Sequence, residues 1–169
     1  SYYKYSQTET VYAKSLLAGL ENGSKLGKIS YRGYSTMSKD VELNYKVYIA
    51  NTDATGFETN TPTDVSTMTL VYDGTARIPT AGTSADPADL LEFQFTEPFV
   101  YEGNGLRVVV EQSGSDYKSA YFQVDKSKTG VSIVRYNDSD ITTAKWGWNA
   151  GLPVANFFVV NTPATLSGK

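Results

Sequence analysis

Two tryptophans near the C-terminal end of the 169-residue chain have the spacing that most strongly suggests a binding chemistry. Trp146 and Trp148 are separated only by Gly147. In an extended segment both rings project to the same side, and the glycine leaves the space between them clear. The apolar C–H faces of sugar rings stack on such rings, while nearby polar groups bind the hydroxyls. The spacing therefore predicts an aromatic platform for a carbohydrate.

Polar residues that could complete the platform lie close by in the sequence. Lys145 and Asn149 flank the tryptophans, and Asp138 and Asp140 precede them. Tyr48 is a further candidate, because the alternation of its own segment places it opposite the apolar face, toward solvent or a groove. A structural interpretation stands beside this one, because tryptophan is highly buried on average and large aromatics can close the open end of a β-sandwich.

The run from Asn137 to Asp140 concentrates oxygen atoms of the kind that bind calcium. Its spacing lacks the glycine and the glutamate of an EF-hand loop, and Asn and Asp are also ordinary loop residues. We therefore expect no cofactor, with calcium at Asn137, Asp138 and Asp140 as the lesser alternative.

The composition argues against catalysis. The chain has no Cys and no His, which excludes disulfides, zinc sites built on Cys or His, and nucleophiles that need an imidazole. The acidic residues are scattered over polar strand positions and turns, and no pair has a reason to converge as glycoside hydrolysis requires. We name no catalytic residue and predict that the chain is not an enzyme.

The charge limits the possible partners. The formal net charge is -3 and the isoelectric point is about 5.0, so the chain repels the phosphates that drive binding to nucleic acids and anionic membranes. It contains no apolar run long enough for membrane insertion. We expect a polysaccharide or glycan partner, no nucleic acid, and a parent protein with several domains.

The elements that must position these residues are predicted to be strands. Thirteen Tyr, seven Phe and two Trp favour pleated, half-buried surfaces. Apolar and polar residues alternate with a period of two in residues 43–49, 91–95, 105–111 and 120–124. Helical signals are limited to single turns in residues 15–20 and 86–89. This predicts an all-β, two-sheet antiparallel β-sandwich with the topology of a jelly roll. It has about ten strands over residues 1–161, followed by a linker or frayed tail at 162–169.

Turn signals separate the predicted strands. Asn22-Gly23, Asp73-Gly74 and Asn104-Gly105 supply residues that tolerate a positive φ. The segment from Tyr72 to Thr75 is the clearest hairpin signal, and it predicts separate strands at residues 68–72 and 75–79.

Several of these segments together resemble a known kind of module. The segments are VYIANT at 47–52, LVYDG at 70–74 and EPFVYEGNGLRVVV at 97–110. They resemble the jelly-roll-like accessory domains of secreted and surface proteins of Bacteroidetes, over most of residues 26–110. The resemblance implies an extracellular or cell-surface domain for adhesion or carbohydrate attachment, and it brings no catalytic residue.

Three functions follow in order of preference. A non-catalytic carbohydrate-binding module predicts that Trp146 and Trp148 are exposed on one surface with a polar rim. A structural or protein-adhesion module in a large surface protein predicts that they are core residues. A polysaccharide lyase or hydrolase would need a cleft with close carboxylates, for which the sequence gives no support.

Overall fold

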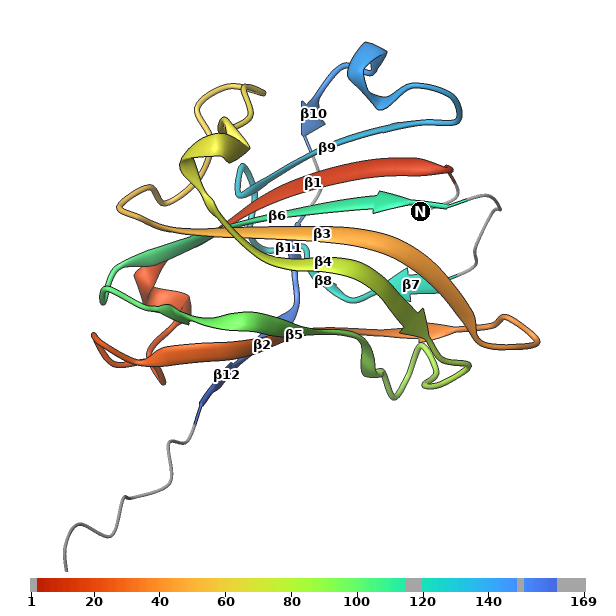
Figure 1. The fold of residues 1–169 in the computed structure, drawn as a ribbon, viewed down its shortest axis with the longest axis horizontal. Coiled ribbons are helices and arrows are strands. Elements are labelled where there is room, and N and C mark those ends of the chain that lie inside the picture. The colour runs from red at the N-terminus through yellow and green to blue at the C-terminus, as the bar shows by residue number, and fades with distance from the viewer. Residues whose placement is uncertain (1–2, 115–119, 149–150, 161–169) are drawn as a thin grey trace, which may run out of the picture.

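The computed structural model describes residues 3–114, 120–148 and 151–160, and this part of the chain is built from strands (Figure 1). The strands are β1 (Tyr5–Tyr12), β2 (Lys25–Ser35), β3 (Val41–Thr52), β4 (Thr69–Ile78), β5 (Ala88–Val100), β6 (Gly105–Ser113), β7 (Ala120–Phe122), β8 (Val124–Asp125), β9 (Ser132–Asn137), β10 (Gly147–Trp148), β11 (Leu152–Pro153) and β12 (Ala155–Val159). Three one-turn 3-10 helices are η1 (Lys14–Leu16), η2 (Val65–Thr67) and η3 (Ile141–Thr143). The predicted tail at 162–169 lies outside the described residues.

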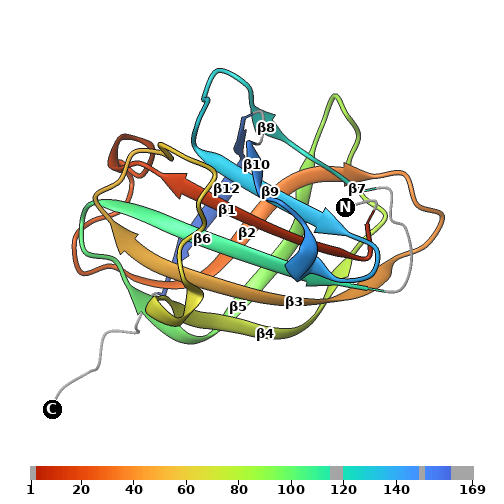
Figure 2. The same ribbon diagram turned by 90° about the horizontal axis from the view of Figure 1, so that it is seen from above.

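Two antiparallel sheets pack face to face, which confirms the predicted sandwich. The larger sheet has six strands in the order β10-β9-β1-β6-β3-β4 (Figure 2). The smaller has four strands, β12-β2-β5 with β7 also paired to β2. Gly33 of β2 pairs with Ala88 of β5 and with Phe122 of β7, so β7 lies on the same edge of β2 as β12. A further pair joins β11 to β8.

The strand pairings are nested along the chain. β3 pairs with β4, β2 pairs with β5, and β1 pairs with β6. A ribbon of antiparallel strands wound onto itself gives this order, which is the winding of a jelly roll. β9 and β10 then extend the larger sheet beyond β1, and β12 extends the smaller sheet beyond β2.

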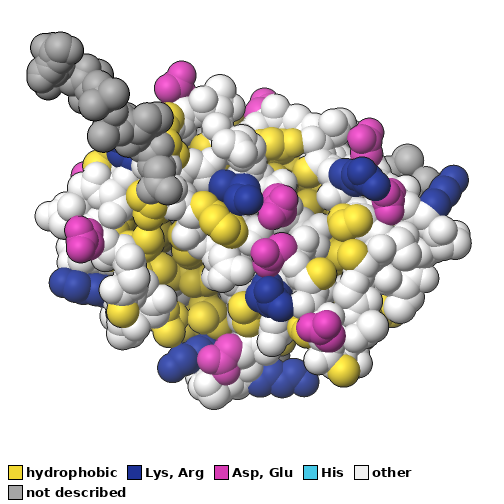
Figure 3. Space-filling model, turned by 90° about the horizontal axis from the view of Figure 1, so that it is seen from below, with side chains coloured by type: hydrophobic (Ala, Val, Ile, Leu, Met, Phe, Trp, Pro, Cys, Tyr) yellow, Lys and Arg dark blue, Asp and Glu magenta, His cyan; other side chains and the backbone are white. Residues whose placement is uncertain are grey.

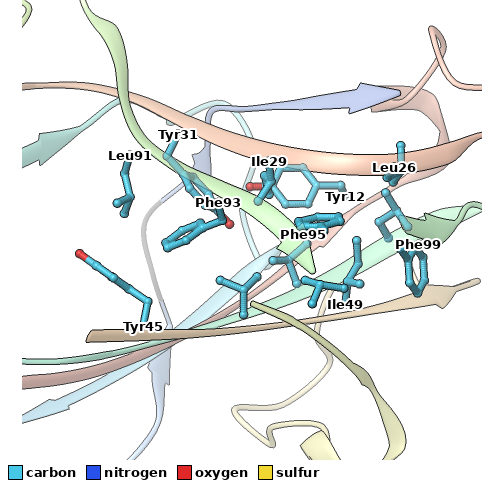
Figure 4. Packing of buried hydrophobic residues seen from close by; sticks show 14 of the residues in the cluster. Tyr12, Leu26, Ile29, Tyr31, Tyr45, Ile49, Leu91, Phe93, Phe95 and Phe99 are labelled. Carbon is cyan, nitrogen blue, oxygen red and sulfur yellow. The ribbon is translucent and has the colours of Figure 1, made fainter. Parts of the chain in front are cut away.

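The core lies between the two sheets and is rich in aromatic residues. Phe93 of β5 is fully buried at its centre, with the Tyr45 ring 5.1 Å away at 66° and the Tyr72 ring 5.0 Å away. Tyr31 approaches the same ring edge-on. Figure 4 shows Leu26 and Phe99 at the opposite end of this cluster. The predicted alternation thus gives one contiguous core.

The Asp73-Gly74 hairpin prediction is wrong. β4 runs unbroken through both residues, with Asp73 opposite Lys46 and Gly74 opposite Tyr45. Gly74 does not have a positive φ. The long β3 offers a continuous pairing partner, and this tertiary pairing overrides a local turn propensity. Because β4 is an edge strand, the small flexible residue costs little there.

Two other local predictions change in detail. The predicted helical turn at residues 86–89 is absent, because β5 begins at Ala88, where pairing with β2 draws the backbone into an extended form. At the predicted Asn104-Gly105 turn, the glycine with positive φ is Gly103, at 88°, while Gly105 opens β6. The Asn22-Gly23 turn is confirmed, with φ of 89° at Gly23.

Candidate functional site

The outer face of the six-stranded sheet carries two rows of side chains that run across the strands. Directly paired residues of antiparallel strands project to the same face. The first row, from β10 to β4, is Trp148, Ile133, Glu9, Val109, Tyr48 and Leu70. The second, which we call the polar row, is Arg135, Gln7, Glu111, Lys46 and Asp73. The register therefore places Trp148 and Tyr48 on one face.

Both tryptophans belong to this outer face, and neither is buried. Trp148 pairs with Ile133 at the edge of the sheet and keeps 49% of its surface exposed. The Trp146 ring is half-buried, and the guanidinium carbon of Arg135 lies 5.0 Å from its centroid. Because Arg135 and Ile133 are alternate residues of β9, both indoles stand on the same side of the sheet.

Hydrogen bonds link the first members of the polar row. The Arg135 Nε donates to the Gln7 side-chain oxygen. The Gln7 amide nitrogen then donates to Glu111 Oε1 at 2.7 Å. Both ends of the Gln7 side chain are fixed, so donors and acceptors along this row are held in place before any ligand arrives.

A shallow hollow of about 170 Å³ lies beside the polar row. Its lining includes Gln7, Lys46, Glu111 and Asp73 of the row. Ile141 of η3 also lines it, so the segment that leads to the tryptophans borders the hollow. The hollow therefore presents side chains of both charges, and Ile141 connects it to the segment that leads to the tryptophans.

Tyr48 lies next to the other end of the polar row. Partial burial raises the pKa of its phenol, and the negative charges of Glu111 and Asp73 raise it further, while Lys46 acts in the opposite direction. The hydroxyl is therefore neutral at physiological pH and can donate a hydrogen bond. Tyr48 and Trp148 are four strand spacings apart, about 19 Å, so one sugar ring cannot contact both.

The middle of the first row is sealed by a loop. Glu9 is 0% exposed, and its carboxylate accepts hydrogen bonds from Arg107 at 2.6 Å and from the backbone and hydroxyl of Thr63, each at 2.8 Å. Arg107 in turn lies over the Phe57 ring. Figures 1 and 2 show residues 53–64 crossing this part of the outer face. Ile133 and Val109 are buried beneath them.

The acidic residues predicted for the rim shape the loop that carries the tryptophans. Asp140 caps η3 and accepts hydrogen bonds from the Thr142 amide at 2.9 Å and hydroxyl at 2.7 Å, which hold the pKa of its carboxyl below its usual range. Asp138 accepts the backbone N–H of Lys4 at 3.2 Å. Lys145 is exposed, and Asn149 lies outside the described residues.

The alternative calcium site gains no support from the geometry. The Asn137 side-chain oxygen accepts hydrogen bonds from the Ser139 amide at 2.9 Å and hydroxyl at 3.1 Å. Asp140 is engaged with Thr142 as described above. Within the described ranges, three or more His, Cys, Asp or Glu side chains do not gather anywhere in a group that could hold a metal ion.

Sequence reasoning did not find Arg135, Gln7, Glu111 and Lys46. Each stands at a polar position of an alternating strand, which is a signal for solvent exposure but not for proximity. Only the register across β9, β1, β6 and β3 brings them into one row.

Comparisons with known proteins add no identity to this geometry. The chain matches no family model, no curated protein and no solved structure. In the part of the chain that the structure describes, no helix is both long enough and apolar enough to cross a membrane.

Proposed function

We propose that this chain is a non-catalytic carbohydrate-binding module that binds a polysaccharide along the outer face of its six-stranded sheet. The observation that carries the proposal is the half-exposed Trp148, which stands with Trp146 beside the hydrogen-bonded polar row. An exposed indole in this setting offers an apolar surface next to a few fixed polar groups, as sugar sites do.

The geometry suggests that different parts of the face make different contacts with a polysaccharide. The apolar face of one sugar ring would stack on Trp148, and the next units would cross the polar row. Gln7 and Glu111 are already fixed by hydrogen bonds, so they lose little side-chain freedom when they bind hydroxyls. A stacked ring adds about 1 kcal/mol, so the affinity for each sugar is modest and a chain of sugars is the better ligand.

The carboxylates of the face support a binding role over a hydrolytic one. Glu111 and Asp73 lie two strands apart with Lys46 in register between them. Glycosidases need two carboxylates that face each other across the bond to be cleaved, whereas here a cation separates them. Glu9, the other acid nearby, is buried under the loop and bound to Arg107.

We place this activity outside the cell, on an extracellular or surface protein with several domains. The sequence motifs that resemble accessory domains of Bacteroidetes support this location. In the structure those motifs are the strands β3, β4 and β6 and the end of β5, which build the sandwich. The tryptophans lie on β10 and just before it, outside the resembling segments, where one member of such a group would carry its own specificity.

The test is affinity electrophoresis through gels that contain single polysaccharides, with a panel of plant and host glycans. We expect one glycan to retard the protein and Trp148→Ala to restore free mobility. The matched control is Phe158→Ala, which removes a 37% exposed aromatic ring from β12 of the other sheet. Equal retardation of the two variants would contradict the site, and no retardation on any glycan would contradict the function.

A protein-adhesion role is the second candidate, and one surface favours it. Val100, Phe158, Val159 and Val160 are all exposed, and the first and last of them lie on either side of Lys25. Figure 3 shows hydrophobic side chains gathered beside the start of the grey tail. Contiguous exposed apolar surface marks contact sites. If every glycan fails in the gel, this surface becomes the place to look for a partner.

A further inference from the structure

A second concave site lies inside the sandwich, on the opposite face of β1 from the polar row. It is a pocket of about 430 Å³ between the two sheets, which we call the inner pocket. It lies toward the end of the sandwich where β1 begins and β6 ends, which we call the open end. The volume falls within the range of sites for small molecules.

One wall of the inner pocket is a row of hydroxyl groups. Ser6, Thr8 and Thr10 occupy alternate positions of β1 and all line the pocket. Gln112 of β6 stands beside them, and its side-chain oxygen accepts a long hydrogen bond of 3.4 Å from Ser6. A strand whose inward residues are Ser and Thr gives up apolar burial, which makes this wall a polar surface in an otherwise apolar interior.

The facing wall is aromatic and apolar. Tyr31 and Leu91 of the smaller sheet line it, together with Phe122 of β7. Tyr31 is edge-on to both Phe93 and Phe122, so its ring is held from two sides. Figure 4 shows Tyr45 rising from β3 at the same end of the core as Leu91. These contacts fix the shape of the wall.

The inner pocket contains no formal charge among the described residues that line it. Burial raises the pKa of the Tyr31 and Tyr45 phenols, so both hydroxyls stay neutral at physiological pH. At the rim, the rings of Tyr3 and Tyr136 stack with centroids 4.2 Å apart, and they are 37% and 48% exposed. The interior is thus neutral and amphipathic, with an aromatic rim.

We infer that the inner pocket binds a small uncharged molecule that has an apolar ring face and a hydroxyl on one edge. A charged ligand would lose its hydration without gaining a counter-charge. A purely apolar ligand would displace water from the hydroxyl row of β1 and replace none of its hydrogen bonds. A neutral ring with a hydroxyl satisfies both walls at once.

The inner pocket and the hollow beside the polar row share Ser6, Tyr45 and Gln112 in their linings, but Thr8 lines only the inner pocket and Gln7 only the hollow. Ser6 and Thr8 alternate with Gln7 on β1, so the two sites use opposite faces of the same strand. A variant on one face need not disturb the other, and either proposal can fail alone.

The test uses three probes that share one ring system: 2-naphthol, naphthalene and 2-naphthalenesulfonate. Their binding is measured by titration calorimetry at neutral pH, where 2-naphthol is uncharged. We expect 2-naphthol to bind, naphthalene to bind about fivefold more weakly for the lack of one hydrogen bond, and the sulfonate to show no binding. Equal affinity for the three probes, or no binding of 2-naphthol, would overturn the inference.

Variants then locate the binding. Thr8→Val keeps the side-chain shape and removes the central hydroxyl. The affinity of this variant for 2-naphthol should therefore fall to its affinity for naphthalene. Val134→Trp fills the pocket from β9 and should abolish binding; if it fails to fold, Leu91→Phe fills it from the facing wall. Trp148→Ala should lose polysaccharide retention while 2-naphthol affinity stays unchanged. Binding that survives in every pocket variant would show that 2-naphthol sits elsewhere.

Discussion

The two halves of β1 differ in burial on both of their faces. Residues Glu9 to Tyr12 are all buried, whereas Tyr5 to Thr8 are all half-buried. The buried half lies toward the end of the sandwich that carries η1, which we call the closed end. The other half of β1, from Tyr5 to Thr8, lies at the open end. One strand therefore divides the molecule into a region that holds the fold together and a region that presents surfaces.

The same division holds on each side of the sheet. On the inner side, fully buried Leu106 sits opposite Tyr12 at the closed end, whereas Ser6 and Gln112 face the inner pocket at the open end. On the outer side, Glu9 is sealed under a loop, whereas Gln7 lies in the polar row. The polar row and most of the inner pocket lie at the open end, whereas Trp148 stands in the same row as Glu9, at the boundary between the two regions.

The largest expected effect is a matched pair of leucine truncations. Leu106→Ala at the closed end should lower the free energy of unfolding by about 4 kcal/mol, because it leaves a cavity in dense packing. Leu91→Ala should cost about 2 kcal/mol, since its side chain already borders the inner pocket and creates no isolated void. Urea denaturation measures both. Equal costs would break the distinction between the two ends.

Removal of the buried carboxylate at the closed end, Glu9, should have the next largest effect on stability. Glu9→Ala leaves Arg107 partly buried without its ion-pair partner. The free energy of unfolding, measured by urea denaturation, should fall by about 3 kcal/mol. Adding Arg107→Met to that variant should recover part of the loss, because it removes the unpaired charge. A double variant less stable than Glu9→Ala alone would show that the loop depends on the arginine for another reason.

Gln7 offers the comparison at the open end, on the same strand and the same face as Glu9. Gln7→Leu removes two hydrogen bonds on a half-buried surface and should cost about 1 kcal/mol. It should also weaken retention on any polysaccharide that Trp148 binds, as affinity electrophoresis would show. A loss of stability as large as that of Glu9→Ala would contradict the division along β1.

The smallest effect concerns pH. Asp40 joins two loops at the open end, and hydrogen bonds from the Thr80 backbone and from Arg77 hold the pKa of its carboxyl below its usual range. A lowered pKa stabilises the fold above the ordinary carboxyl pKa, and this stability is lost as pH falls through the folded-state value. Asp40→Asn should lower the Tm slightly at about pH 7 and not at about pH 2.5. A difference that persists in acid would mean that the charge is irrelevant.

Local patterns in the sequence predict which face a residue takes, but not what it meets there. The alternation around Tyr48 places it on the outer face, and the spacing of Trp146 and Trp148 places both indoles on one side. Their neighbours depend on register between distant segments: Gln7 and Arg135 are 128 positions apart. No local pattern encodes such a pairing, because strand register is fixed by the whole sheet.

Two other features could not be predicted from the sequence, for different physical reasons. The Asp73-Gly74 pair has turn propensity, yet β3 holds it in a strand, so tertiary pairing decides the outcome. The inner pocket depends on how far two sheets stand apart at one end. Hydroxyl residues on the inward positions of β1 hint at a polar interior, but the facing residues Tyr31 and Leu91 come from other strands.

The placement of β12 has a consequence for how the chain folds. Its residue Ala155 pairs with Tyr31, and the Tyr12 hydroxyl donates to the Pro153 carbonyl at 2.8 Å across 141 positions. Phe157 of β12 completes the apolar layer beside Tyr12. The edge of β2 from Leu26 to Tyr31 therefore stays unpaired during synthesis until β12 has been made. Such long-range closure is slow, so the nascent protein must stay soluble with part of this sheet edge open until β12 pairs with β2.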